Sequence, residues 1–224
     1  KIGFTGTPIE KEDKSTKEVF GDVIHSYKIH DAVRDRATVR LTCEGRLVQL
    51  HLDNKMIGKD FEKITEDLDP DVTERLSRRW SELKTVLEDL DRLDVIAKDV
   101  VHHFTEKKKV LKGKAMLAAS TKLAAARYAD IISKIPGAPR CTCIISGMPQ
   151  DLPDDASEER KSREEVVSKH YKSKQEIDDL IKQFKDEKND LELLIVCDMY
   201  LTGFDAPPTH TMYIDKLLRD HNLI

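Results

Sequence analysis

The spacing of apolar positions changes along the chain, and each spacing predicts a different kind of element. Apolar runs occupy KAMLAA and CTCIIS, and a third run, LELLIVC, ends at Cys197. The segments between them, KLAAARYADIISKI and KQEIDDLIKQFK, have the three- and four-residue apolar spacing of amphipathic helices. Buried strands that alternate with helices are typical of a parallel sheet covered on both faces. We therefore predict an α/β fold for the half of the chain that follows Gly113.

One long apolar stripe precedes this α/β unit, in a helical segment that we expect over about residues 59–112. Asp69-Pro70 favours a helix start, because a capping acid is followed by proline in the first turn. The stripe consists of Trp80, Leu83, Leu87, Leu90, Leu93, Ile96, Val100 and Phe104. Such a stripe either docks a partner or packs on its own domain. We favour packing within the domain, because apolar residues at helical spacing usually form core.

The beginning of the chain has shorter patterns. Ile2 to Thr5 is typical of a short buried strand, and the charged stretch that follows is typical of a linker. We then expect a short strand from Val23, a helix over HDAVRDR, and a β-rich pair around residues 37–52.

From these patterns we expect a short strand and a linker in residues 1–20, followed over residues 21–224 by a unit that carries the helical insertion. Because the chain begins at Lys1, partway along an apolar strand, we expect it to be a piece of a larger protein.

Composition narrows the class of partner only slightly. With 38 basic and 42 acidic residues, the net charge of −4 gives no overall basic field, although a local groove can still bind phosphates. No apolar run approaches the roughly 20 residues of a transmembrane helix, and no signal peptide is visible. We expect a cytoplasmic protein with no membrane partner.

Metal ligands are not evident. The four cysteines (Cys43, Cys141, Cys143 and Cys197) lack Cys-x-x-Cys spacing, and strand-like apolar settings favour buried, reduced thiols. The adjacent His102 and His103 cannot share one helix face. We predict no metal site.

Three loops follow the predicted strands, and ligands of parallel sheets bind at that carboxyl edge. They are Ser120-Thr121-Lys122, Ser146-Gly147-Met148 and the stretch from Asp198 to Pro208. A hydroxyl of Ser120 or Thr121 can cap the following helix, or the helix N-terminus can hold a phosphate with help from Lys122. The local sequence favours the cap.

The third loop contains Thr202-Gly203-Phe204-Asp205. Gly203 permits a backbone conformation or a close approach that a side chain forbids. Asp205 offers a carboxylate to ribose hydroxyls, but a turn in which it bonds its own backbone fits the local sequence equally well. Thr5 to Pro8 makes a similar, weaker turn signal after the first strand.

Together, GFTGTPI, GKAMLAASTKLAAARYADII and LLIVCDMYLTGFDAPPTHTMYIDKLL resemble successive helicase motifs of the motor (R) subunit of type I restriction enzymes. The resemblance implies a superfamily 2 helicase, in which two RecA-like domains bind ATP between them and pump double-stranded DNA. A separate nuclease domain cleaves the DNA when translocation stalls. The chain would comprise the last strand of the first motor domain and most of the second.

The resemblance also implies roles for individual residues. The positions that match ATP-binding and coupling motifs are Thr5, Gly6, Thr7, Gly203 and Asp205. The positions that match DNA-facing motifs are Ser120, Thr121, Lys122 and Thr202.

Several motor parts are missing from these 224 residues. There is no phosphate-binding Gly-x-x-x-x-Gly-Lys-Ser/Thr loop and no Asp-Glu box for magnesium, and the family's arginine motif is expected after Ile224. The resemblance therefore implies ATP and Mg²⁺ as cofactors of the parent protein, with the magnesium ligands elsewhere. We expect the piece alone neither to hydrolyse ATP nor to cut DNA. Double-stranded DNA and the methyltransferase and specificity subunits are the implied partners.

Two other interpretations remain open from sequence. In one, the chain is the second domain of another superfamily 2 protein, such as a repair helicase or a type III restriction subunit. It also fits a non-catalytic scaffold whose helical segment docks the modification subunits.

Overall fold

The computed structural model divides the chain into two compact units, drawn from residues 1–47 and 48–217. The residues it describes are 2–4, 10–11, 14–46, 84–149, 152–153, 155–201 and 203–216. Among the helices in those ranges, none has the length and apolar character needed to cross a membrane. The predicted helix start at Asp69-Pro70, together with Trp80 and Leu83, lies outside the described residues.

The first unit contains short elements only. Strands β1 (Glu10–Lys11) and β2 (Lys14–Ser15) pair antiparallel, and they are followed by helices α1 (Thr16–Phe20) and α2 (Ile29–Arg34). Helix α2 confirms the helix predicted over HDAVRDR.

Three other predictions for this unit are wrong. Residues 2–4 form no strand, and the side chains of Ile2 and Phe4 are 73% and 97% exposed. The charged stretch predicted to be a linker contains the short elements β1, β2 and α1, and its role as a linker stays a prediction. No strand is present in residues 21–46, which include Val23 and the described part of the expected β pair. A buried strand needs paired neighbours and covering elements, and the described residues of this unit supply neither.

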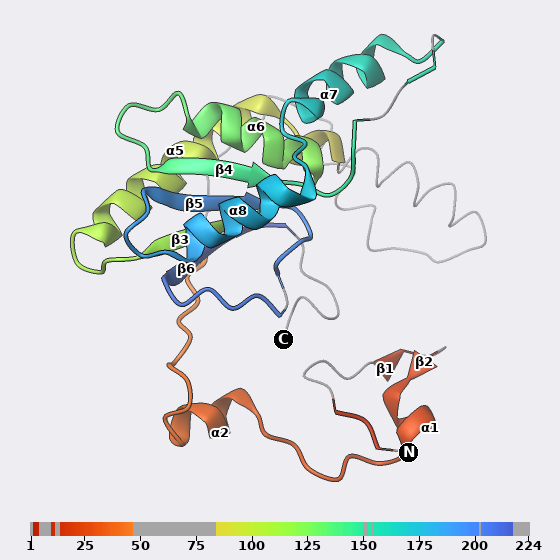
Figure 1. Cartoon of the computed structure of the whole chain (residues 1–224), viewed down its shortest axis with the longest axis vertical. Helices are drawn as coiled ribbons and strands as arrows, with labels where there is room; N and C mark the ends of the chain where they lie inside the picture. Colours follow the sequence, from red (N-terminus) through yellow and green to blue (C-terminus); the bar gives the residue numbers. More distant parts are fainter. Residues whose placement is uncertain are drawn as a thin grey trace, which may run out of the picture. The chain divides into compact units, whose positions relative to one another are not determined.

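The second unit is built on one parallel sheet, with strands in the order β4-β5-β3-β6 (Figure 1). The strands are β3 (Lys114–Ala119), β4 (Arg140–Ile144), β5 (Leu191–Val196) and β6 (Thr209–Asp215). The helices are α5 (Leu90–Lys108), α6 (Lys122–Ile132), α7 (Glu158–Ser168) and α8 (Lys174–Lys185). The predicted α/β fold is confirmed, and it is consistent with a RecA-like helicase domain. Helix α7 was missed, because its residues read as a polar connection.

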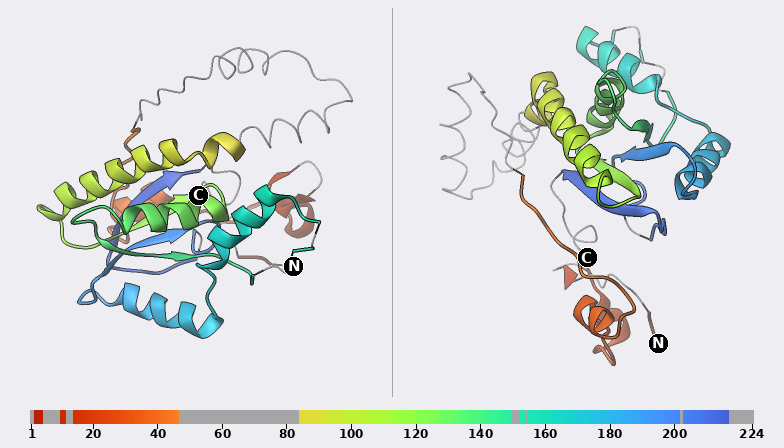
Figure 2. Two further views of the ribbon diagram at one scale, coloured as in Figure 1. Left: turned by 90° about the horizontal axis from the view of Figure 1, so that it is seen from above. Right: turned by 90° about the vertical axis from the view of Figure 1, so that its left-hand side faces the viewer.

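Helices cover both faces of this sheet, as Figure 2 shows. Side chains alternate between the faces of a strand, so Leu117 belongs to the core cluster under α5 and α6, whereas Met116 belongs to the cluster under α8. Parallel register places Met116 beside Leu194 and Leu117 beside Ile195. The central strands β3 and β5 are therefore buried on both sides, which is why they have continuous apolar runs.

Helix α5 is part of the core of this unit. The side chains of Leu93, Val100 and Phe104 are buried in the same cluster as residues of α6 and β6. For residues 90–108, packing of the apolar stripe within the domain is thus confirmed. Leu90 is the exception, with 55% of its surface exposed.

A polar contact fixes the start of α5 to the end of β6. The Arg92 guanidinium donates to both carboxylate oxygens of Asp215, and the Tyr128 hydroxyl donates to Asp215 Oδ2 at 2.6 Å. Burial, reinforced by the neighbouring carboxylate, raises the pKa of Tyr128, so the phenol stays protonated as a donor. Three elements therefore converge on one carboxylate.

The cysteines only partly follow the prediction. Cys143 and Cys197 are buried, and burial raises the pKa of each thiol to about 12, which keeps them protonated and unreactive. Cys43, however, is exposed, because its segment forms no strand.

Replacement of Phe104 tests whether α5 is integral to the fold. Phe104→Ala removes a side chain with no exposed surface and is expected to lower the free energy of unfolding by roughly 3–5 kcal/mol. Val95→Ala, on the same helix but 40% exposed, is the matched control and should change it by about 0.5 kcal/mol or less. Urea denaturation measures both; equal effects would show that α5 does not belong to the core.

Candidate functional site

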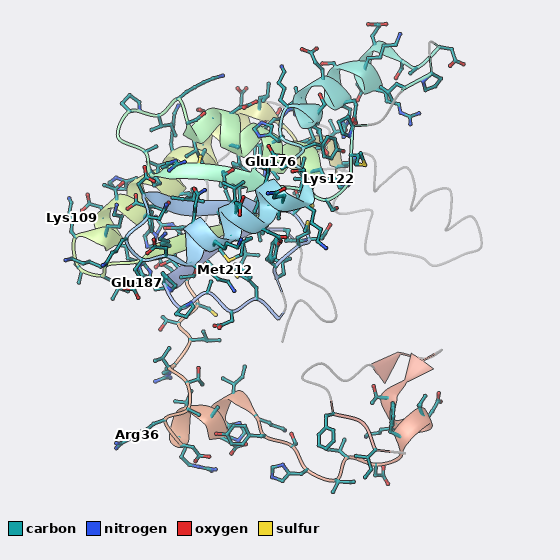
Figure 3. All side chains as sticks on the ribbon, in the orientation of Figure 1. Arg36, Lys109, Lys122, Glu176, Glu187 and Met212 are labelled. Atoms are coloured by element: carbon teal, nitrogen blue, oxygen red, sulfur yellow. The ribbon has the colours of Figure 1, made fainter. Side chains whose placement is uncertain are left out.

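The carboxyl ends of the strands border a cleft of about 700 Å³. Ser120, Thr121 and Lys122 line it from the end of β3, Asp198 lines it from the end of β5, and α7 forms another wall. Lys122, labelled in Figure 3, lies at the end of the sheet towards which the strand arrows of Figure 1 point. The expected convergence of loops at this edge is therefore confirmed for the first loop and the start of the third.

Thr121 is the N-cap of α6. Its hydroxyl accepts a hydrogen bond from the backbone amide of Ala124 at 3.1 Å and donates one to Glu88 Oε1 at 2.7 Å. The capping interpretation is confirmed for Thr121. Because both contacts are internal, this hydroxyl holds the turn and has no donor left for a ligand.

Ser120 is the hydroxyl of this loop that retains hydrogen-bonding capacity. Its Oγ atom is buried and has no hydrogen-bond partner within the described part of the chain. A buried hydroxyl without a partner is unfavourable unless a water molecule or a ligand satisfies it. The residue lines the cleft beside the N-terminus of α6, where backbone amides of the first turn lack partners in the helix.

Lys122 joins the first loop to the second. Its ammonium donates to the carbonyl oxygen of Ser146 at 2.6 Å. The next residue, Gly147, has φ at +109°, a backbone conformation that residues with a side chain rarely adopt, so glycine favours this turn. Among the described residues Lys122 forms no ion pair with a carboxylate, although its charge helps to lower the pKa of Asp198.

Lys216 makes a corresponding contact between the ends of β5 and β6. Its ammonium donates to the carbonyl of Cys197 at 3.0 Å and to the carboxylate of Asp198 at 2.5 Å. The hydrogen bond from Lys216 is the main cause that lowers the pKa of Asp198. Sequence reasoning did not single out Lys216, although it directly follows the Asp of Tyr-Ile-Asp-Lys.

Glu88 is the central residue that the sequence did not reveal. Its side chain is 3% exposed and accepts hydrogen bonds from Thr121 and, at 2.5 Å, from Arg163 of α7. Arg127 of α6 also donates to its backbone carbonyl. The partners Thr121 and Arg163 are 33 and 75 residues away along the chain, so no local spacing indicates the cluster.

The rest of the third loop turns away from the cleft. The Phe204 ring stacks on Phe184 of α8 with centroids 6.5 Å apart, and Tyr200 lies against Phe204 at 4.9 Å. Gly203, with φ at +66°, makes the turn, and Asp205 is exposed; neither lines the cleft. The structure does not bring these two residues together with Ser120.

Four predicted site residues, Thr5, Gly6, Thr7 and Thr202, lie outside the described residues. Their roles stay predictions. Within the described ranges, no group of three His, Cys, Asp or Glu side chains is placed to hold a metal ion.

Removal of the Glu88 carboxylate should lower the stability of the fold, because this side chain joins the elements that border the cleft. Glu88→Ala leaves Arg163 and the Thr121 hydroxyl without their carboxylate, and we expect a loss of roughly 2–3 kcal/mol in the free energy of unfolding. The control Glu159→Ala removes an 82% exposed carboxylate that also faces Arg163, and should have little effect. Thermal denaturation measures the loss of stability in both variants. A loss for Glu88→Ala no larger than that of the control would contradict the role assigned to Glu88.

Comparison with known proteins indicates the family of the chain. Residues 111–224 match the family model of type I restriction enzyme subunit R domain 3, and residues 1–74 match that of the SWI2/SNF2 ATPase. The chain is 36% identical over 99% of its length to the type I restriction enzyme MjaIXP endonuclease subunit of Methanocaldococcus jannaschii. It is also 36% identical over its whole length to the HindI endonuclease subunit of Haemophilus influenzae.

The chain covers 20% of the length of each of these relatives. The domain-3 match extends over half of the chain and includes all four strands of the parallel sheet and the loops that border the cleft. The chain therefore belongs to the family of type I restriction enzyme R subunits.

Proposed function

We propose that this chain is the second RecA-like motor domain of a type I restriction subunit that uses ATP to translocate double-stranded DNA. The observation that carries the proposal is the cleft beyond the strand ends, where a buried, unpartnered Ser120 hydroxyl adjoins the start of α6. The carboxyl edge of a parallel sheet is the usual place for a ligand in such folds.

The DNA contact would be made to the phosphate backbone. Ser120 can donate its hydroxyl proton to a phosphate oxygen, the first amides of α6 offer further donors, and Lys122 supplies a positive charge that forms no ion pair with a described residue. Thr121 serves this site as a positioning residue, because its cap fixes the turn that presents Ser120. Thr202 stays a predicted contact. Contacts of this kind make translocation independent of sequence and sensitive to salt.

The nucleotide contact would lie on the other part of the third loop. Asp205 is exposed and has no hydrogen-bond partner among the described side chains, so its carboxylate is available to ribose hydroxyls. Packing of Phe204 against Phe184 holds the segment that presents it. Thr5, Gly6 and Thr7 remain predicted to couple the ATP site to DNA. Magnesium would be held by residues elsewhere in the protein.

The motor cycle follows from placing these contacts on two domains. Hydrolysis of ATP, bound between the domains, supplies the free energy for closing and opening the interdomain cleft. In each state Ser120 and Lys122 hold the backbone with different strength relative to the contacts of the first domain. Alternation between the backbone contacts of the two domains moves the duplex.

The assembly is also part of the proposal. The relatives are endonuclease subunits by name, so the parent protein is proposed to act as a type I site-specific deoxyribonuclease. Double-stranded DNA and the methyltransferase and specificity subunits are its proposed partners, in the cytoplasm.

Ser120→Ala in the full-length subunit tests the DNA contact. Loss of one hydrogen bond to a phosphate should raise about tenfold the duplex concentration that half-maximally stimulates ATP hydrolysis. Ser133→Ala removes a hydroxyl beyond the other end of α6 and should leave this concentration unchanged. An unchanged value for Ser120→Ala would refute the DNA assignment of the cleft.

Asp205→Ala tests the nucleotide contact separately. Without a carboxylate for the ribose, the KM for ATP should rise several-fold, while the half-stimulating duplex concentration stays the same. Asp186→Ala, a carboxylate that lies directly after α8, provides the matched control. An ATP KM equal to that of the wild type would remove Asp205 from the nucleotide site.

A further inference from the structure

The α7 side of the cleft carries charges to which the family motifs assign no role. Lys84 and two arginines of α7, Arg160 and Arg163, line the cleft together with Lys122. Four cations therefore border the same space as the Ser120 hydroxyl, which has no hydrogen-bond partner among the described residues; the carboxylates of Glu88, Glu159, Glu164 and Asp198 line it as well.

These cations are not equivalent. Arg163 is neutralised, because it forms an ion pair with the buried carboxylate of Glu88 and lies 3.7 Å from Glu159. Arg160 and Lys84, in contrast, are exposed and have no ion pair with any described residue. Glu88 thus holds Arg163 in the wall, whereas Arg160 has no carboxylate partner among the described residues.

The two free cations reach the cleft from different elements. Lys84 lies in the helical turn before α5, and Arg160 lies in the first turn of α7, whereas Ser120 follows β3. The Glu88 network ties these elements together, since Glu88 contacts Thr121 at the start of α6 and Arg163 one turn after Arg160. The two cations therefore border the cleft from separate elements whose backbones are joined by the Glu88 network, and they share the cleft with the carboxylates of Glu159, Glu164 and Asp198.

We propose that Arg160 and Lys84 form a second phosphate-binding position beside Ser120, so that the cleft holds successive phosphates of one nucleic-acid strand. The proposal rests on the assignment of the cleft to DNA. Distributed cations on separate elements suit an extended backbone, because each neutralises one phosphate and releases condensed counterions. Arg160 can in addition present a bidentate fork to a phosphate.

The test is the salt dependence of binding of the full-length subunit to a duplex without a recognition site. Arg160→Ala and Lys84→Ala should each weaken binding several-fold at low salt and reduce the slope of log K against log salt by about 0.9. Arg160→Lys should keep the slope. Lys169→Ala removes a charge from the residue that follows α7, which pairs with Glu165 outside the cleft, and should change neither quantity.

Three outcomes separate the possibilities. If Ser120→Ala weakens binding while Arg160→Ala and Lys84→Ala behave like Lys169→Ala, the second position is wrong and the DNA assignment stands. If none of the cleft variants alters binding, the DNA assignment itself fails. If Arg160→Ala raises the KM for ATP and leaves the slope unchanged, the cations bind phosphates of the nucleotide, and the proposal is overturned. Melting temperatures equal to that of the wild type show that the variants are folded.

Discussion

The buried carboxylate of Glu88 is the contact on which the architecture of the cleft depends. A carboxylate removed from water is costly unless hydrogen bonds satisfy it, and here donors from α6 and α7 do so. Glu88 itself is neither a helix cap nor part of a strand. It fixes three elements at the point where the turn after β3 presents Ser120, so a structural requirement determines the geometry of the candidate site.

A second, partly buried carboxylate performs a similar task at the end of β6. Asp215 receives Arg92 and Tyr128, and the next residue, Lys216, reaches back to the end of β5. These two adjacent residues thus have different roles. Asp215 fixes α5 and α6 against the sheet, and Lys216 joins the ends of β5 and β6 beside the cleft. Both arrangements follow from side chains at the end of a strand pointing alternately to the two faces.

The sequence predicted what depends on local pattern. The strands β3, β4 and β5, the helices α6 and α8, and the Thr121 cap were readable from apolar spacing and from one capping residue. Contacts such as Glu88 with Arg163 were not readable, because their partners are remote in the chain and each residue looks like an ordinary surface charge.

Other failures have equally specific causes. Ile2 and Phe4 have the composition of a buried strand, yet burial depends on neighbours that composition does not reveal. The loop from Asp198 to Pro208 read as one site, but stacking of Phe204 on Phe184 divides it into a part beside the cleft and a part that turns away. Tertiary contacts, rather than local propensity, decided these cases.

The central claim is that the turn between β3 and α6 contacts the DNA backbone. Amide hydrogen exchange of residues 120–124 in the full-length subunit, with and without a duplex lacking a recognition site, tests it most directly. The account predicts slower exchange of these amides when duplex is added, and a return to the free rate at high salt. Exchange that is identical with and without saturating duplex would contradict it.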